Sequence, residues 1–119
     1  MTQPLISAII CTHNRARYLG AAIASLLGQT YSAYEVIVVD NASTDDTKAV
    51  VEAYLPHPQL SYAYESTLGL SAARNRGAAI ARGSILAYLD DDAEASPQWL
   101  AALAEAFTEP PEAAIAGGA

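Results

Sequence analysis

Apolar segments of strand length alternate with helical patterns along this chain, and that alternation restricts the fold more than any other feature. Residues 5–11 (LISAIIC) and 34–40 (YEVIVVD) are mainly apolar runs, which is typical of strands covered on both faces. Residues 60–65 (LSYAYE) alternate between apolar and polar side chains and predict a third, less buried strand. Residues 85–89 and 113–117 predict a fourth and a fifth strand.

A helical pattern separates each predicted strand from the next. We expect one helix over residues 15–28, with Asn14 as its N-cap, and further helices that begin near Ser43, Ser71 and Ser96. Strands and helices in alternation predict an α/β fold, with three layers (α/β/α) built around a mostly parallel sheet.

The composition argues against several kinds of function. A length of 119 residues suits one compact domain. Thirteen acidic and six basic residues give a formal charge of −7, which opposes binding to nucleic acid or to an anionic membrane. No apolar run reaches the roughly 18 to 20 residues of a membrane span, and the first residues lack the basic flank of a signal peptide. Cys11 is the single cysteine, so we expect a cytoplasmic protein, with any membrane contact made through a larger parent protein.

Polar residues follow the strands at one end only. Residues 12–15 come after the first predicted strand, residues 40–43 after the second, residues 67–70 after the third and residues 90–92 after the fourth. In parallel sheets of this kind ligands bind beyond the carboxyl ends of the strands, where the strand order reverses. The sequence therefore predicts a ligand site at this edge of the sheet.

Three consecutive aspartates, Asp90, Asp91 and Asp92, are the sharpest local signal. Carboxylates two positions apart at the end of a strand can converge on one hard cation, and their oxygen ligands suit Mg²⁺ or Mn²⁺. The alternative is a solvated acidic loop. The position directly after an apolar strand favours the metal, with Asp90 and Asp92 as its ligands.

Two further side chains have both a functional and a structural interpretation. Asp40 accepts hydrogen bonds only, so it suits the N3–H of uracil or thymine. Aspartate is equally common as a residue that stabilises a turn or caps a helix. Arg74, in the first turn of its helix, can reach a phosphate or a base, but it can also lie on the helix surface. We interpret Cys11 as inert and His13 as structural.

Four motifs of this chain resemble the family 2 glycosyltransferases, which have a GT-A fold. The motifs are residues 10–15 (ICTHNR), 36–47 (VIVVDNASTDDT), 69–77 (GLSAARNRG) and 89–93 (LDDDA). They occur in the family's order and cover nearly the whole chain. The resemblance implies transfer of a sugar from a nucleoside-diphosphate donor, UDP or dTDP, with inversion at the anomeric carbon and with help from Mn²⁺ or Mg²⁺.

The resemblance also implies roles for individual residues. Thr12 and Asp40 would contact the nucleoside, and Arg74 the base or the diphosphate. Asp90–Asp92 matches the family's Asp-x-Asp motif, which contacts the ribose and the metal. The full set expected to bind the nucleotide sugar is Thr12, Asn14, Arg15, Asp40, Asn41, Gly69, Arg74, Asp90 and Asp91, with the metal at Asp90 and Asp92.

Members of this family normally continue well beyond the length of this chain. We therefore expect residues 1–119 to be the N-terminal, donor-binding half of a GT-A domain, truncated on its C-terminal side. The acceptor-binding half and the general base would lie beyond residue 119, so that this fragment alone would be inactive. The acceptor (a glycan, a lipid-linked sugar or a protein) stays open, and polysaccharide or cell-envelope synthesis is the expected setting. An incomplete sheet edge can pair with a second copy.

Three other classes of protein fit the sequence less well. A phosphoacceptor receiver domain carries an acid pair after its first strand and a lysine after its fifth, whereas in this chain the first strand ends in Cys11-Thr12 and Lys48 lies in a helix. A nucleotidyltransferase usually has a glycine-rich loop after the first strand, and residues 12–16 contain no glycine. A non-catalytic nucleotide-sugar binding domain remains as a further alternative.

Overall fold

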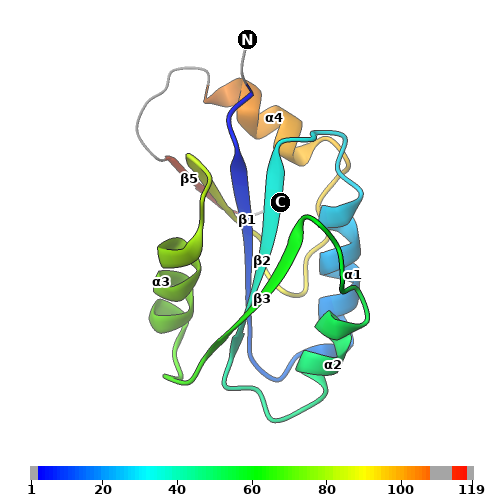
Figure 1. The fold of residues 1–119 in the computed structure, drawn as a ribbon, viewed down its shortest axis with the longest axis vertical. Coiled ribbons are helices and arrows are strands. Elements are labelled where there is room, and N and C mark those ends of the chain that lie inside the picture. Colours follow the sequence, from blue (N-terminus) through cyan, green and yellow to red (C-terminus); the bar gives the residue numbers. More distant parts are fainter. Residues whose placement is uncertain (1–2, 108–113, 118–119) are drawn as a thin grey trace.

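A computed structural model describes residues 3–107 and 114–117, with side chains up to residue 107 (Figure 1). The sheet has five parallel strands in the order β3-β2-β1-β4-β5. The strands are β1 (Ile6–Thr12), β2 (Tyr34–Asn41), β3 (Leu60–Glu65), β4 (Ile85–Tyr88) and β5 (Ala114–Gly117). The helices are α1 (Ala16–Leu27), α2 (Thr47–Glu52), α3 (Leu70–Ile80) and α4 (Trp99–Ala106).

Helices cover both faces of the sheet, which confirms the expected three-layer α/β/α fold. Helices α1 and α2 lie on one side of the strands and α3 on the other (Figure 1). Leu100 of α4 belongs to the same apolar cluster as Leu26 of α1, so α4 covers the α1 side. Among the helices that the structure describes, none is long and apolar enough to cross a membrane.

Alternate residues of β1 supply the two halves of the core. Ile6, Ala8 and Ile10 are fully buried against the helices on the α1 side. Ile9 points the other way and packs in a smaller cluster with Ala73 of α3. This is why the sequence of β1 is mainly apolar: a central strand with helices on both faces has no side that meets water.

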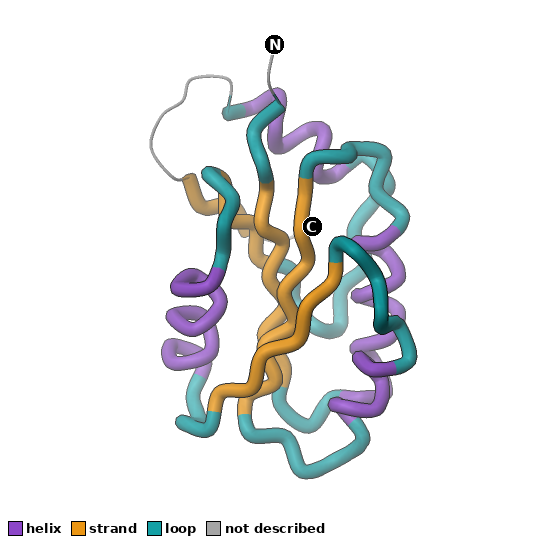
Figure 2. The backbone as a smooth tube through the Cα atoms, in the orientation of Figure 1, coloured by secondary structure: helices purple, strands orange, loops and turns teal. Residues whose placement is uncertain are grey.

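Strand order places the end of β1 at the centre of one edge of the sheet. The chain passes from β1 to β2 and β3 on one side and then returns to β4 and β5 on the other. The reversal therefore lies between β1 and β4, and all strands finish toward the same end of the molecule (Figure 2). The loops that diverge at such a reversal leave a crevice for a ligand.

The start of α1 differs from the expectation. Asn14, the expected cap of this helix, has a left-handed backbone (φ 52°), and its Oδ1 accepts hydrogen bonds from the backbone N–H groups of Thr44 and Asp45. Asp45 instead accepts from the N–H of Ala16, 3.1 Å away, and from that of Thr47. The helix is thus capped from the next loop, a contact that no local pattern indicates.

A buried carboxylate ties the strands together at the edge opposite the crevice. Glu35 accepts hydrogen bonds from the Ser7 hydroxyl (2.6 Å) and from the backbone N–H of Arg82 (2.7 Å), whose guanidinium also contacts it. Ser7 Oγ in turn accepts from the N–H of Gly83, where a Cβ atom would come within 2.6 Å of the carbonyl oxygen of Leu5. The turn before β4 is therefore fixed against β1 and β2.

We predict that Glu35→Gln lowers the free energy of unfolding by about 1–3 kcal/mol at pH 7, because an amide presents a donor to groups that already donate. Burial raises the pKa of Glu35, but the hydrogen bonds outweigh it and lower the pKa below its ordinary 4.5. The carboxylate's contribution is thus complete above about pH 4.5 and is lost as the pH falls through the folded-state pKa. Urea unfolding should show the two proteins converging in acid.

The exposed Glu105 of α4 offers a matched control. Glu105→Gln removes the same charge at the surface and should change the unfolding free energy by less than about 0.5 kcal/mol. An equal loss in both variants would show that net charge, not the Glu35 network, is responsible.

Candidate functional site

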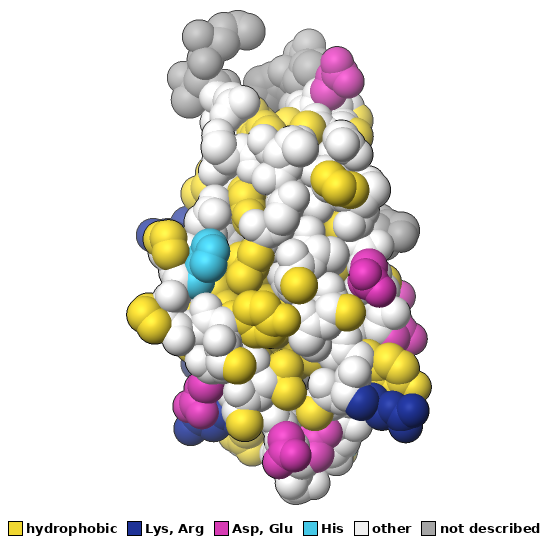
Figure 3. Space-filling model, turned by 90° about the vertical axis from the view of Figure 1, so that its right-hand side faces the viewer, with side chains coloured by type: hydrophobic (Ala, Val, Ile, Leu, Met, Phe, Trp, Pro, Cys, Tyr) yellow, Lys and Arg dark blue, Asp and Glu magenta, His cyan; other side chains and the backbone are white. Residues whose placement is uncertain are grey.

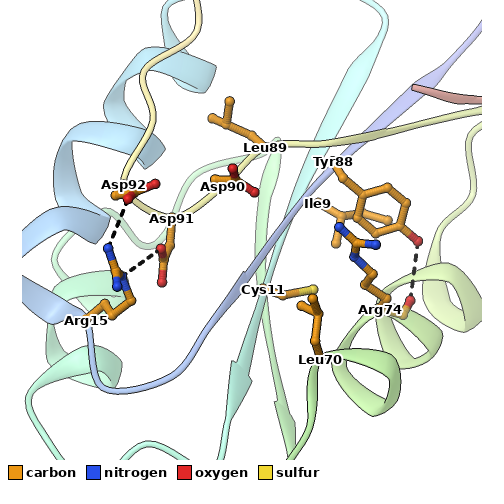
Figure 4. Close-up of a pocket in the computed structure, with 10 residues that line it drawn as sticks. All are labelled: Ile9, Cys11, Arg15, Leu70, Arg74, Tyr88, Leu89, Asp90, Asp91 and Asp92. Carbon is orange, nitrogen blue, oxygen red and sulfur yellow. Dashed lines mark hydrogen bonds and ion pairs between the residues drawn. The ribbon is translucent and has the colours of Figure 1, made fainter. Parts of the chain in front are cut away.

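A cavity of about 290 Å³ opens between the ends of β1 and β4, at the reversal of strand order. Figure 4 shows three acidic side chains and Arg15 on one side of it and Arg74 with Tyr88 on the other. The cavity is lined by Ile9, Cys11, Arg15, Leu70, Arg74, Tyr88, Leu89, Asp90, Asp91 and Asp92. At the end of the molecule where the strands finish, acidic and basic side chains also lie together on the face seen in Figure 3.

Asp91 is the most enclosed of the three aspartates, at 9% exposure. Its Oδ2 accepts a hydrogen bond from the Thr12 hydroxyl (2.9 Å), and its Oδ1 lies 3.0 Å from Nε of Arg15. The pKa of Asp91 lies above its ordinary value, mainly because the carboxyl group is buried. The hydrogen bond from Thr12 and the charge of Arg15 lower the pKa, and the charges of Asp92 and Asp90 raise it. Asp91 therefore joins the end of β1 to the loop after β4.

Asp92 and Asp90 are more open than Asp91. Asp92 Oδ2 is 3.0 Å from Nη2 of Arg15, so one guanidinium bridges two neighbouring carboxylates. The Asp90 side chain makes no hydrogen bond or ion pair with the described residues and borders the cavity. One carboxylate of the triplet is thus open to a ligand, and two are held by Arg15.

The donor set fits a divalent cation that arrives together with a phosphate ligand. Within the described residues, no three His, Cys, Asp or Glu side chains are placed to enclose a metal ion. Mg²⁺, however, is usually held by one or two carboxylates together with substrate phosphates and water, not by a cage made of protein alone. Asp90 and Asp92, the expected ligands, supply the oxygen chemistry for that mode of binding.

Arg74 stands across the cavity from the carboxylates. Its guanidinium lies over the ring of Tyr88, 5.3 Å from the ring centre, and makes no ion pair with the described residues. Stacking on an aromatic ring orients a guanidinium while leaving its N–H groups available to an anion. Sequence reasoning missed Tyr88. Strand alternation could have found it, because Ile85 and Ala87 face the α1 side and Tyr88 must face α3.

A second cavity of about 350 Å³ adjoins the first and shares Cys11 and Leu70 with it. Its walls are mainly apolar, and it is lined by Cys11, Thr12, His13, Asn41, Leu68, Gly69, Leu70 and Ala73. Burial raises the pKa of the Cys11 thiol to about 11, so the thiol stays protonated and is a poor nucleophile. The structure thus brings Thr12, Asn41 and Gly69 together beside the carboxylates, with Cys11 between the two cavities.

Asn41 fixes the loop between β3 and α3. Its Nδ2 donates to the carbonyl oxygens of Glu65 (3.1 Å) and Thr67 (2.8 Å), and its Oδ1 accepts from the N–H of Gly69 (2.9 Å). Gly69 has φ +143°, a backbone conformation that favours glycine. Because α3 begins at the next residue, Asn41 also determines where Arg74 stands.

Asp40 lines a different cavity from these residues. In β2 it alternates with Asn41, so it shares the α1 side of the sheet with Val36 and Val38. One of its oxygens accepts from the N–H of Ser43 (3.1 Å) and the other from the Tyr62 hydroxyl (2.6 Å). In the sheet register Asp40 pairs with Thr12 of β1, but it lines neither of the two cavities above and borders a third one instead. Its part in base recognition stays a prediction.

Comparisons with known proteins agree on one family. The family described as "Glycosyl transferase family 2" matches residues 7–119. Validoxylamine A glucosyltransferase from Streptomyces hygroscopicus subsp. jinggangensis is 36% identical over 119 residues, which cover 97% of this chain and 28% of that protein. Glucosyl-dolichyl phosphate glucuronosyltransferase from Haloferax volcanii is 28% identical over 116 residues, which cover 95% of this chain and 37% of that protein.

Solved structures show the same architecture. S. aureus TarS in complex with UDP-GlcNAc has a TM-score of 0.79 and 30% identity, covering 85% of this chain and 30% of that one. The mannosyltransferase PcManGT from Pyrobaculum calidifontis, in complex with GDP-Man and Mn²⁺, has a TM-score of 0.84 and 29% identity, covering 92% and 34%. The chain thus spans between 28% and 37% of the length of these four proteins.

We predict that Asn41→Asp loosens the loop before α3. The substitution keeps the shape but turns a carboxylate toward two carbonyl oxygens, which should cost about 1–3 kcal/mol in unfolding free energy. Amide hydrogen exchange at residues 66–69 should become faster than in the unchanged chain. Asn75→Asp, at an exposed position of α3, adds the same charge and should do neither. Equal changes in unfolding free energy and in hydrogen exchange in the two variants would show that the hydrogen bonds of Asn41 do not hold this loop.

Proposed function

The chain belongs to glycosyl transferase family 2 and has a GT-A fold, and we propose that it forms the donor-binding half of a longer glycosyltransferase. One observation carries the proposal. A cavity at the reversal of strand order has an open carboxylate at Asp90 and an available guanidinium at Arg74 on opposite sides. That combination suits a diphosphate, which needs a cation on some of its oxygens and direct hydrogen bonds on others.

The proposed ligand is a nucleoside-diphosphate sugar. Arg74, oriented by Tyr88, would bind the diphosphate. Asp90 and Asp92 would hold Mn²⁺ or Mg²⁺, which when bound neutralises the diphosphate and stabilises it as a leaving group. TarS in complex with UDP-GlcNAc and PcManGT with GDP-Man and Mn²⁺ support this class of donor and a divalent ion.

The nucleoside would occupy the apolar second cavity, beside Thr12 and Gly69. A flat base binds more tightly when it is buried between apolar walls, and the polar groups at the rim of the cavity fix its orientation. UDP or dTDP is the proposed donor. Asp40 does not line the second cavity, so it would accept a hydrogen bond from the N3–H of a base that extends past Thr12, its neighbour in the sheet. Because both oxygens of Asp40 already accept hydrogen bonds, a base can bind there only in exchange for Tyr62 or Ser43.

Sugar transfer needs, besides the donor site, a group that takes the proton of the acceptor hydroxyl. The acceptor hydroxyl attacks from the face opposite the leaving diphosphate, with inversion, and a carboxylate must lie within hydrogen-bond reach of it. We place that base, with the acceptor-binding half, in the remainder of the protein, and expect residues 1–119 to bind donor without transferring sugar. Polysaccharide or cell-envelope synthesis, on the cytoplasmic side, is the proposed setting.

We predict that UDP binds at least about tenfold more tightly with Mn²⁺ than in EDTA, since without a cation the diphosphate meets three carboxylates. Arg74→Gln should weaken UDP binding with Mn²⁺ by about tenfold. Isothermal titration measures both. Arg76→Gln, which removes an exposed charge from the same helix, should leave the affinity within about twofold. Equal UDP affinity in Mn²⁺ and EDTA would refute the metal role, and preference for an intact triphosphate would favour a nucleotidyltransferase.

Asp40→Asn tests base recognition separately. If Asp40 accepts a hydrogen bond from the base, UDP affinity should fall about tenfold, a loss of one good hydrogen bond, and the preference for UDP over CDP should shrink. Competition titrations with the two nucleotides give both values. If stability falls while the preference for UDP stays the same, Asp40 serves only the turn that it makes with Ser43 and Tyr62.

A further inference from the structure

Two of the three carboxylates at the site are already paired with a cation that belongs to the protein. Arg15, the residue before α1, lies 3.0 Å from Asp91 and 3.0 Å from Asp92. We propose that Arg15 is the resident counter-charge of this cluster and that it makes cation binding depend on bound nucleotide. This inference rests on the proposed function, because it concerns the same cavity.

The geometry gives Arg15 the position of a competitor. Its Nη2 binds Asp92 Oδ2, an oxygen of one of the two proposed metal ligands. Its Nε binds Asp91, whose other oxygen is held by the Thr12 hydroxyl. Tyr18 supports the guanidinium, with its ring centre 5.0 Å away. A cation that arrives alone meets one open carboxylate, Asp90, and to gain a second it must share Asp92 with Arg15 or displace Arg15 from it.

A diphosphate changes this balance. Arg15 lines the same cavity as Arg74 and its side chain is 44% exposed, so the guanidinium can exchange Asp92 for a phosphate oxygen. That exchange releases Asp92 to the cation, while the diphosphate supplies further oxygen ligands. Coupling of this kind is reciprocal: nucleotide raises the affinity for the cation by the same factor as the cation raises the affinity for nucleotide.

The test measures Mn²⁺ binding to the chain without nucleotide, by calorimetry or by the electron paramagnetic resonance of free Mn²⁺. Arg15→Gln should bind Mn²⁺ about tenfold more tightly than the unchanged chain, because the competing charge is gone. The same variant should bind UDP in EDTA about threefold more weakly, because the cluster has lost its counter-charge. The two shifts have opposite signs. A merely loosened site would weaken both ligands.

Arg17→Gln is the matched control. Arg17 lies over the same Tyr18 ring, 5.1 Å from its centre, but makes no ion pair among the described residues. Its loss changes the net charge equally and should leave Mn²⁺ affinity within about twofold. Arg15→Lys, which keeps the charge but lacks the planar guanidinium whose Nε and Nη2 each contact one carboxylate, should fall between the unchanged chain and Arg15→Gln. It serves as the test variant if Arg15→Gln unfolds.

The outcomes separate this inference from the proposed function. If UDP binding depends on metal but Mn²⁺ alone binds equally to the unchanged chain, Arg15→Gln and Arg17→Gln, the counter-charge role is overturned and the donor site stands. If UDP binds in neither condition, the proposed function fails and the coupling fails with it. Tighter Mn²⁺ binding in both arginine variants would also overturn the inference, because net charge would then explain it.

Discussion

The burial of β1 on both faces and both edges is the constraint on which the rest of the structure depends. It pairs with β2 on one side and with β4 on the other, and all of its residues but one are buried. Water does not reach the middle of such a strand, so the hydroxyl of Ser7 is satisfied by Glu35 and Gly83. The hydroxyl of Thr12, at the end of the strand, binds Asp91 at the crevice. The site lies where it does because the most buried strand finishes there.

The loops around the crevice depend on one another more than on the strands they follow. Asn14 holds the loop after β2, Asp45 from that loop caps α1, and Asn41 holds the loop after β3. Thr12 binds Asp91 and so joins the loop after β4. Such cross-connections explain why an edge made of connecting segments can hold charged groups at fixed separations. They replace the water that loop backbones would otherwise need.

The sequence was sufficient for what depends on local pattern. The strand predicted over residues 60–65 forms β3 with the same bounds, because alternation and flanking turn residues are local signals. The start of α1 was not predictable in this way, because its cap comes from Asp45. Asp40 and Asn41 show the same limit. Successive residues of a strand point to opposite faces of the sheet, so only one of these two neighbours can face the second cavity. A shift of the strand register by one residue would exchange their positions.

The mixed charge of the cavity has a consequence that neither the acidic nor the basic residues have alone. Carboxylates alone would concentrate cations, and arginines alone would bind any phosphate. In this cavity Arg15 pairs with both Asp91 and Asp92, while Asp90 and Arg74 stay available on opposite walls. A free cation that approaches Asp90 is repelled by the two arginines, and a free anion that approaches Arg74 is repelled by the carboxylates. The ligand that satisfies both walls carries phosphate and cation together, which favours a metal-bound diphosphate over either component.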